Sequence, residues 1–389
     1  MESQISIIQG PPGTGKTQTI LNIIANILMQ DKTVQIVSNN NAATENVYEK
    51  LSSPRYNLGF IAATLGKSDN RKSFVANQNI DYPDFTAWKA EDDLTKLQQQ
   101  IAEQSTQLKC VFDKKEKLAC LKQELSGLIT ELEYFRQYIE ESDVNTELIK
   151  LSRKLSSEDW MTLWQESQLI SEKEKTMGFI FKIKALIRYG IISWNFYKQD
   201  IAKIIITFQA MYYCAKQAEL SDEIAEIESY LNNVDQKLLD NLCDGSMKLL
   251  KNKLAGRYGE NDHRRIFSED DLKKEPYSVL QEYPVILSTT FSSRNSLNAD
   301  VVYDYLIMDE ASQVDIATGA LALSCARNVV IVGDTKQLPN VIPSEMKNTV
   351  DSIFDSFQIN EGYRYTNSFL QSVCLLYTSP SPRDYAASR

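Results

Sequence analysis

The segment from residue 5 to residue 18, ISIIQGPPGTGKTQ, constrains the fold of this chain more than any other part of it. Its isoleucines predict a short β-strand, and the apolar spacing that follows predicts a helix from Thr17 to Met29. The loop between them matches G-x-x-x-x-G-K-[ST] at Gly10, Gly15, Lys16 and Thr17. A glycine-rich loop can occur by chance, but strand, loop and helix follow one another in the order that phosphate binding requires.

The residue types in this loop suit a nucleoside triphosphate with Mg²⁺. Phosphate oxygens need several backbone N–H groups aimed at one point, which a loop with little Cβ bulk supplies where it enters a helix. We expect Lys16 to contact the β- and γ-phosphates and the Thr17 hydroxyl to bind Mg²⁺. The predicted nucleotide-binding residues here are Gly10, Pro11, Pro12, Gly13, Thr14, Gly15, Lys16, Thr17 and Gln18.

Charge and cysteine usage limit the class of protein. The 389 residues are 43% hydrophobic and carry a net charge of -10, so contacts with nucleic acid have to come from local basic patches. The six cysteines form no C-x-x-C pair and His263 is the single histidine, so we expect neither structural zinc nor histidine catalysis. We expect a soluble protein of the reducing cytoplasm, with no membrane partner, because no signal peptide or apolar run of about 18 residues occurs.

Further strands are predicted on both sides of a long helical region. The first block adds a strand at 33–38, a helix at 42–51 and a strand near 58–64, and the later block adds strands at 285–288, 301–308 and 328–332. Repeated strand–helix units predict an α/β fold with a parallel, doubly wound sheet. We therefore predict one domain split between residues 1–67 and 281–373, interrupted by a helical insertion over 68–280.

Heptad spacing predicts that the insertion contains an antiparallel coiled-coil stalk. A helix of 46 residues is expected from Leu94, and a second from Ile201 to about Leu239 with a phase slip near Leu220. A compact helical domain is the alternative. Ten of the fourteen predicted a and d positions of the first helix are apolar, and Gln104, Lys115, Lys122 and Arg136 are the other four. All fourteen positions are Leu94, Leu97, Ile101, Gln104, Leu108, Val111, Lys115, Leu118, Lys122, Leu125, Ile129, Leu132, Arg136 and Ile139.

The stretch from Lys175 to Gln199 has five basic residues and no acidic one, with aromatic residues between them. Such a patch is a candidate for contacts with phosphates and stacked bases, which here would involve Lys182, Lys184 and Arg188. A core helix whose lysines extend to solvent explains the pattern at least as well.

The apolar strand that ends in Asp309-Glu310 supplies the second part of the predicted site. In a chain with a phosphate-binding loop, Asp309 is expected to hold Mg²⁺, and Glu310 to orient and deprotonate the attacking water. Two acids after a strand are otherwise often only a solvated strand end. Gln313 and the segment Gly333-Asp334-Thr335-Lys336-Gln337-Leu338-Pro339 are expected to sense the γ-phosphate.

These motifs resemble those of superfamily 1B helicases, the senataxin and nonsense-mediated-decay branch. GPPGTGKT at 10–17, DEASQ at 309–313 and GDTKQLP at 333–339 are similar to motifs I, II and III, while SNNNAATENV at 38–47 and STTFSSR at 288–294 resemble motifs Ia and Ic. The resemblance implies a RecA-like P-loop NTPase that uses ATP and Mg²⁺ to move 5′-to-3′ on single-stranded DNA or RNA. It implies nucleotide roles for Lys16, Thr17, Asp309, Glu310 and Gln337, and contacts with the strand at Ser38, Asn39, Thr289 and Thr290.

Three family features are missing. Only nine residues precede Gly10, too few for the glutamine motif of the adenine pocket. The second RecA-like domain, with the arginine that reaches the γ-phosphate, is absent, and Arg364 in EGYRYTN does not match the motif that carries that arginine. We therefore expect a fragment of a longer helicase that hydrolyses ATP weakly by itself.

The tail CLLYTSPSPRD, from Cys374 to Asp384, resembles a translated sequencing-library adapter. Residues 374–389 are accordingly predicted to be non-native, with the native sequence ending near Val373 and Met1 being an internal methionine. The alternative is a disordered Ser/Pro-rich terminus.

Two other functional classes remain possible. A structural-maintenance-type ATPase also places a coiled coil between its two nucleotide motifs, but it needs an LSGG-like signature before Asp309, which is not present. A P-loop nucleotide switch without motor activity is the second alternative.

Overall fold

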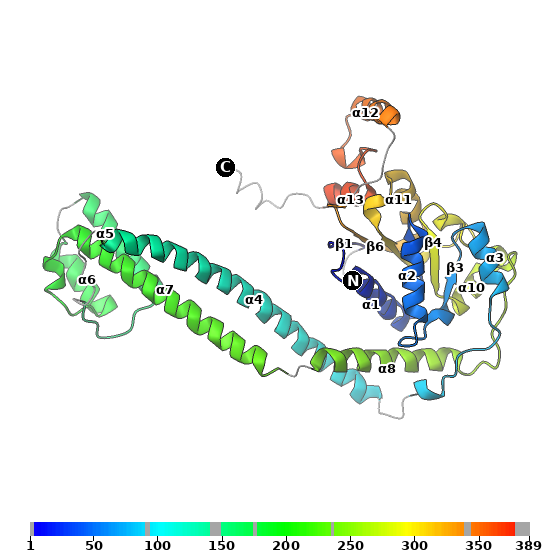
Figure 1. Cartoon of the computed structure of the whole chain (residues 1–389), viewed down its shortest axis with the longest axis horizontal. Coiled ribbons are helices and arrows are strands. Elements are labelled where there is room, and N and C mark those ends of the chain that lie inside the picture. The colour runs from blue at the N-terminus through cyan, green and yellow to red at the C-terminus, as the bar shows by residue number, and fades with distance from the viewer. Residues whose placement is uncertain are drawn as a thin grey trace. The chain divides into compact units, whose positions relative to one another are not determined.

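The computed structural model describes residues 4–89, 94–140, 149–173, 177–234, 237–337 and 344–377 (Figure 1). The chain forms two compact units, one from residues 1–97 and 245–389 and the other from residues 98–244. We call them the sheet unit and the helical unit. The helical unit is shorter than the predicted insertion of 68–280, because side chains such as Trp88 and Leu250 belong to the hydrophobic core beside the sheet.

The sheet unit contains six parallel strands in the order β1-β6-β5-β2-β4-β3. The α/β fold with a parallel sheet is thus confirmed. Strands from the beginning of the chain lie beside strands that follow the helical unit. The sheet therefore needs the chain segments on both sides of the helical unit. The strands are β1 (Ile5–Gln9), β2 (Val34–Ser38), β3 (Ala62–Thr64), β4 (Val285–Thr289), β5 (Tyr303–Asp309) and β6 (Ala326–Gly333).

Two hydrophobic cores, one on each face, hold helices against this sheet. One core joins α1, α2 and the C-terminal half of α8 to side chains such as Ile36 and Ile307. The other joins α10 and α13 to side chains such as Ile286 and Met308. The helices are α1 (Lys16–Met29), α2 (Asn41–Ser52), α3 (Ser68–Ala76), α8 (Leu238–Tyr258), α9 (Asp271–Lys274), α10 (Pro276–Glu282), α11 (Ile316–Leu323), α12 (Ser344–Phe357) and α13 (Phe369–Tyr377).

Short 3₁₀ helices connect several of these elements: η1 (Gly59–Ile61), η2 (Thr86–Trp88), η5 (Ser293–Asn295), η6 (Ala311–Gln313) and η7 (Glu361–Tyr363). Helix α13 continues through Cys374 to Tyr377, and Cys374 packs against the second core. These four residues therefore extend a packed helix past Val373, where the native sequence was predicted to end. Residues 378–389 lie outside the described part of the chain, so the adapter resemblance stays a prediction.

The helical unit contains an antiparallel coiled coil of α4 (Leu94–Glu140) and α7 (Ile201–Asn232). Three cross-helix contacts show the direction: Cys110 with Tyr230, Lys117 with Glu223, and Glu124 with Lys216. The position on α4 rises by seven at each step while the position on α7 falls by seven, which is the heptad period of a coiled coil. Helix α7 is continuous through the slip expected near Leu220.

The buried face of α4 departs from the predicted a positions after Val111. Leu121, Leu128 and Phe135 are buried there, whereas Ile129, a predicted a position, is 39% exposed. The predicted a positions were thus wrong in this half of α4, whereas the predicted d positions Leu118, Leu125 and Leu132 do pack in the coiled-coil core. Charged residues at three predicted a positions, Lys115, Lys122 and Arg136, explain the shift, since rotating the helix buries apolar side chains in their place.

The helical unit contains a second cluster of packed helices. It therefore has both the predicted coiled-coil stalk and a part that resembles the alternative prediction of a compact helical domain. Helices α5 (Ser157–Lys173) and α6 (Phe179–Tyr189), with the short η4 (Phe196–Lys198), pack around side chains that include Trp160, Phe196 and Phe208. Nowhere in the described parts of the two units does a helix combine the length and apolarity needed to span a membrane.

Candidate nucleotide-binding site

The sequence motifs meet at one edge of the sheet because the parallel strands end there together. Gln9 pairs with Gly333, and Ser38 pairs with both Asp309 and Thr289. The segments that follow β1, β2, β4, β5 and β6 therefore start side by side, although the first follows Gln9 and the last follows Gly333. Ligands of open parallel sheets bind at this carboxyl edge.

The loop after β1 has the backbone of a phosphate-binding loop. Gly13 and Gly15 both have a φ of 85°, in the left-handed region that favours glycine. A Cβ atom on Gly10 would come within 2.5 Å of the Thr14 Oγ1 atom, so a larger residue would push the loop apart. The Gly10 N–H donates to the Gly333 carbonyl at 3.1 Å, which ties this loop to the end of β6.

Helix α1 begins at this loop with N–H groups available for a ligand. Gly15 is its N-cap and provides no side-chain hydrogen bond, so the N–H groups of the first turn have no cap. Pro11, Pro12 and Gln18 are exposed, and Thr17 is half-buried in the first turn. The Lys16 ammonium donates to the Gly10 carbonyl at 2.9 Å and so lies across the loop.

Asp309 lies at the end of β5 and is electrostatically linked to Lys16. Its side chain is only 7% exposed, and this burial raises the pKa of the Asp309 carboxyl to about 6. The positive charge of Lys16 acts in the opposite direction and lowers that pKa. The Lys16 ammonium thus lies near enough to the Asp309 carboxyl for the two charges to interact, while their shared role at one nucleotide stays a prediction.

Glu310 adopts a backbone conformation that is uncommon for a non-glycine residue. Its φ is 53° and ψ is 41°, and its N–H donates to the Asp309 Oδ1 atom at 2.9 Å. The Oε2 atom of Glu310 is buried and has no hydrogen-bond partner among the described residues. A buried carboxylate oxygen without a partner is costly, which is a reason to expect a ligand or water beside it.

The third motif is held close to these acids by small residues. A Cβ on Gly333 would lie 3.3 Å from the backbone nitrogens of Ala311 and Ser312, so glycine lets the ends of β5 and β6 approach. Asp334 is 8% exposed, and its Oδ1 atom accepts from the Lys336 N–H at 2.9 Å. Gln337 follows in a turn and is half-buried, whereas Leu338 and Pro339 of the same motif lie outside the described residues.

A hydrogen bond that sequence analysis missed joins the nucleotide motifs to the predicted strand contacts. The Asn39 Nδ2 atom donates to the Gln313 carbonyl at 2.9 Å. No local signal marks this bond, because the two residues become neighbours only through the pairing of β2 with β5.

The residues predicted to contact nucleic acid differ in exposure. Ser38 and Thr290 are completely buried and Thr289 is 9% exposed, whereas Asn39 is exposed. The Thr290 N–H donates to the Ser38 carbonyl at 3.1 Å, so these two hold the ends of β2 and β4 together. Of the four, Asn39 is the residue that a strand could reach directly.

The basic stretch forms helix α6 of the helical unit. Phe181, Ala185 and Tyr189 are buried, while Ile180 and Ile187 on the opposite face are 84% and 78% exposed. The Lys184 ammonium is paired with Glu166 at 2.6 Å, and Lys182 and Arg188 lie near the rings of Tyr197 and Tyr189. Lys175 lies outside the described residues. The buried face of α6 agrees with the alternative prediction of a core helix. Contacts of Lys182, Lys184 and Arg188 with nucleic acid stay predictions.

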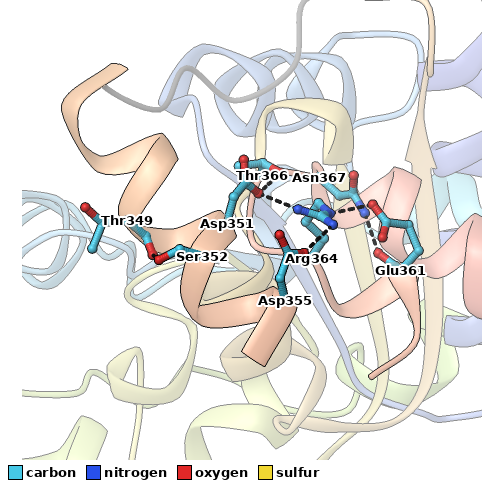
Figure 2. Close-up of polar contacts among 8 residues, drawn as sticks. All are labelled: Thr349, Asp351, Ser352, Asp355, Glu361, Arg364, Thr366 and Asn367. Atoms are coloured by element: carbon cyan, nitrogen blue, oxygen red, sulfur yellow. Dashed lines mark hydrogen bonds and ion pairs between the residues drawn. The ribbon is translucent and has the colours of Figure 1, made fainter. Parts of the chain in front are cut away.

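Arg364 is occupied by three carboxylates, as Figure 2 shows. Its guanidinium pairs with Asp351 and Asp355 of α12 and with Glu361 of η7, and it stacks 4.3 Å from the Phe354 ring. This arrangement joins α12 to the chain before α13. It agrees with the sequence argument that Arg364 does not serve as the arginine of the γ-phosphate.

Comparison with known proteins finds a matching protein family and several similar helicases. The model of the AAA_11 family, an AAA domain, matches residues 1–345. The uncharacterized ATP-dependent helicase MG140 of Mycoplasma genitalium is 24% identical over 91% of this chain, and its homolog in Mycoplasma pneumoniae is 24% identical over 93%. The DNA polymerase alpha-associated DNA helicase A of Schizosaccharomyces pombe is 33% identical over 23% of the chain.

The matched segments cover 40% and 41% of the two Mycoplasma proteins, so the chain spans well under half of their length. The family match, in contrast, covers most of this chain and includes the phosphate-binding loop, Asp309, Glu310 and the third motif at 333–339. The chain belongs to the AAA_11 family of AAA domains.

Proposed function

We propose that this chain is the ATP-binding part of a superfamily 1B helicase that moves 5′-to-3′ on single-stranded nucleic acid. The observation that carries the proposal is the meeting of Lys16, Asp309 and Glu310 at one edge of the sheet, with the charge of Lys16 acting on the Asp309 carboxyl. The similar proteins named ATP-dependent helicases, and the one named a DNA helicase, support the same function. Lys16 comes from the first chain segment of the sheet unit, and Asp309 and Glu310 come from the second.

The residues at this edge fit ATP and Mg²⁺. The uncapped N–H groups at the start of α1 and the Lys16 ammonium are donors for phosphate oxygens, and the half-buried Thr17 hydroxyl and the Asp309 carboxylate are oxygen ligands of the kind Mg²⁺ takes. When bound, Mg²⁺ would neutralise charge on the β- and γ-phosphates. In the proposal Thr17 and Asp309 hold it, Gly10 to Gln18 enclose the phosphates, and Gly333, Asp334 and Gln313 complete the pocket.

Glu310 is the proposed general base. Its unpartnered Oε2 atom would accept a proton from the attacking water, and the rigid backbone at this residue would keep the carboxylate in one direction. Gln337 would distinguish the states with and without a γ-phosphate, as the third motif of the family does. The hydrogen bond from Asn39 to the Gln313 carbonyl would transmit a movement of the nucleotide-binding residues to Asn39, which is exposed and is proposed to contact the nucleic acid.

Complete motor activity is proposed for a longer protein with a second RecA-like domain. An arginine that stabilises the transferred phosphoryl group is worth about 10³–10⁵ in rate, and Arg364 is engaged by three carboxylates instead. We therefore expect slow ATP turnover from this chain. The scattered free cysteines suit the reducing cytoplasm as its location.

A binding experiment tests this function against a nucleotide switch without motor activity. Fluorescence anisotropy would measure the affinity for oligothymidylate and oligouridylate, with and without a non-hydrolysable ATP analogue. We expect measurable affinity that differs between the two nucleotide states. A protein that bound the analogue but neither oligonucleotide in either state would contradict the helicase proposal and favour the switch.

A further inference from the structure

Two adjoining cavities lie in the sheet unit on the side of β3 and β4, and the nucleotide motifs do not line either of them. The smaller has a volume of about 220 Å³ and the larger about 610 Å³. Tyr48, Thr64 and Ser73 line both cavities, so the two cavities are adjacent. Helix α2, which carries Tyr48, lies beside β4 (Figure 1).

The smaller cavity opens at the same sheet edge as the predicted strand contacts. Thr289 lines it at the end of β4, together with Thr44 and Asn41 from the start of α2. A Cβ on Gly66 would lie 3.0 Å from the Thr289 nitrogen, so a glycine lets the end of β3 lie against β4 here. Hydroxyl and amide groups predominate in the lining, which also includes the exposed carboxylate of Glu45. Hydroxyl and amide groups bind the sugars and phosphates of a nucleic-acid backbone.

The larger cavity has a different chemistry. Five aromatic side chains line it, accompanied by the amides of Asn57, Asn77 and Asn79. Two exposed carboxylates, Asp81 and Asp84, also line it, and they oppose the entry of a phosphate. The group that fits here is therefore flat, uncharged and polar at its edge. The aromatic residues are Tyr48, Phe60, Phe74, Tyr82 and Tyr283.

A buried arginine holds three of these rings in place. The Arg264 side chain is 3% exposed and pairs with Glu282 at 3.3 Å. Its guanidinium lies 4.0 Å from the centre of the Tyr283 ring, 5.4 Å from that of Tyr82 and 5.8 Å from that of Phe60. The Tyr82 hydroxyl donates to the same Glu282 carboxylate at 2.7 Å. Glu282 offsets the charge of Arg264, so this arginine serves to order the aromatic wall and not to attract phosphate. Aromatic walls fixed before binding lower the entropic cost of binding.

We infer that the larger cavity binds an unpaired nucleobase of a single strand whose backbone passes over the smaller cavity. This inference rests on the proposed function, because it needs nucleic acid at this edge of the sheet. Bases stack on aromatic side chains without strong sequence preference, and amide groups can bond their edges. The volume lies in the range of about 300–1,000 Å³ that is usual for small-ligand sites, which leaves room for a base with its sugar.

Tyr48 is the residue to change, because its ring is 37% exposed and lines both cavities, so Tyr48→Ala leaves the core intact. The probes are an oligothymidylate, the same oligonucleotide with abasic sites, and one carrying a fluorescent purine analogue that stacking quenches. We expect wild-type protein to bind the abasic strand roughly ten-fold or more weakly than the intact strand. Tyr48→Ala should abolish that difference and the quenching, because it removes one ring of the aromatic wall.

Tyr277→Ala is the matched control, since Tyr277 is 65% exposed in the sheet unit and does not line either cavity. Equal binding of intact and abasic strands by wild-type protein would overturn the base pocket while leaving the proposed track intact. Quenching that survives Tyr48→Ala would overturn it as well. No affinity for any of the probes would overturn the track and the pocket together.

Discussion

The two compact units of this protein are stabilised by different contacts: packing between two long helices in one, and pairing of parallel strands in the other. In the helical unit, contacts between α4 and α7 follow the heptad period in register, from Cys110–Tyr230 to Glu124–Lys216. In the sheet unit, the Gly10 N–H donates to the Gly333 carbonyl, so the first strand depends on the last. The helical unit therefore has a regular seam, whereas the sheet unit gathers distant segments at one edge.

This difference shows where chemistry can be placed. A coiled coil repeats the same apolar contact along its length and offers solvated charges on its outside, such as the pair of Lys117 with Glu223. Parallel strands end together and bring polar residues from several loops to one place, partly buried and close to a helix start. The buried Asp309 carboxyl with its raised pKa and the left-handed backbone of Glu310 are both in the sheet unit.

The largest effect is expected where the sheet unit gathers its charges. Lys16→Ala should lower ATP turnover by about 10³-fold, because it removes the cation proposed to contact the β- and γ-phosphates. Phosphate release at saturating ATP measures this. Lys50→Ala, which changes an exposed lysine in the last turn of α2, is the control and should behave as wild type. Turnover retained by Lys16→Ala would mean that the edge of the sheet is not the site.

The next largest effect would show whether the two units are independent. Leu220 is 3% exposed in the coiled-coil core, so Leu220→Ala should lower the free energy of unfolding of the helical unit by about 2–4 kcal/mol. Urea unfolding followed by circular dichroism measures the loss. Tyr134→Ala, at a side chain that is 71% exposed on α4, should change stability by less than about 0.5 kcal/mol. ATP turnover at low urea should be the same in both variants, and a parallel loss of turnover would show that the units depend on each other.

A smaller effect concerns the cost of burying Asp309. Burial raises the pKa of this carboxyl to about 6 in the folded protein from its usual 3.8, so the folded state binds the proton more tightly than the unfolded state. Stability of the unliganded protein should therefore fall as pH rises from about 4 to 6, and then stay level. Asp309→Asn should remove this dependence and stabilise the protein at neutral pH by up to about 3 kcal/mol, while abolishing turnover.

Urea unfolding at a series of pH values measures this effect, with Asp300→Asn as a control at an exposed carboxyl. If Asp309→Asn and wild type lose stability in parallel between pH 4 and 6, the burial of Asp309 does not cause the loss.

The smallest effect on catalysis is expected for Arg364. If its role is to join α12 to η7, Arg364→Ala should speed proteolytic cleavage at α12 and lower ATP turnover by less than about ten-fold. Limited proteolysis and phosphate release measure the two effects, and Arg327→Ala at an exposed position of β6 is the control. A loss of turnover near 10³-fold with α12 still protected would identify Arg364 as a catalytic residue after all.

Local pattern predicted much of the fold. The helix predicted from Leu94 to residue 139 is α4, and the strand predicted at 33–38 contains β2. The phosphate-binding loop was predicted from spacing alone, and two of its glycines, Gly13 and Gly15, adopt the left-handed conformation. The a positions of α4 past Val111 were mispredicted because the heptad frame was held fixed across Lys115 and Lys122, whereas the helix buries the apolar Leu121 and Leu128.

By itself, the sequence determined the identity of the motifs, the elements that carry them and the parallel character of the sheet, since spacing and apolar period are local properties. Only the tertiary structure decided that β6 lies between β1 and β5, that Asn39 bonds to Gln313, and that Ser38 and Thr290 are buried. The physical reason is that strand order and burial arise from packing between segments far apart in the chain, and no local pattern records which strand becomes the neighbour of which.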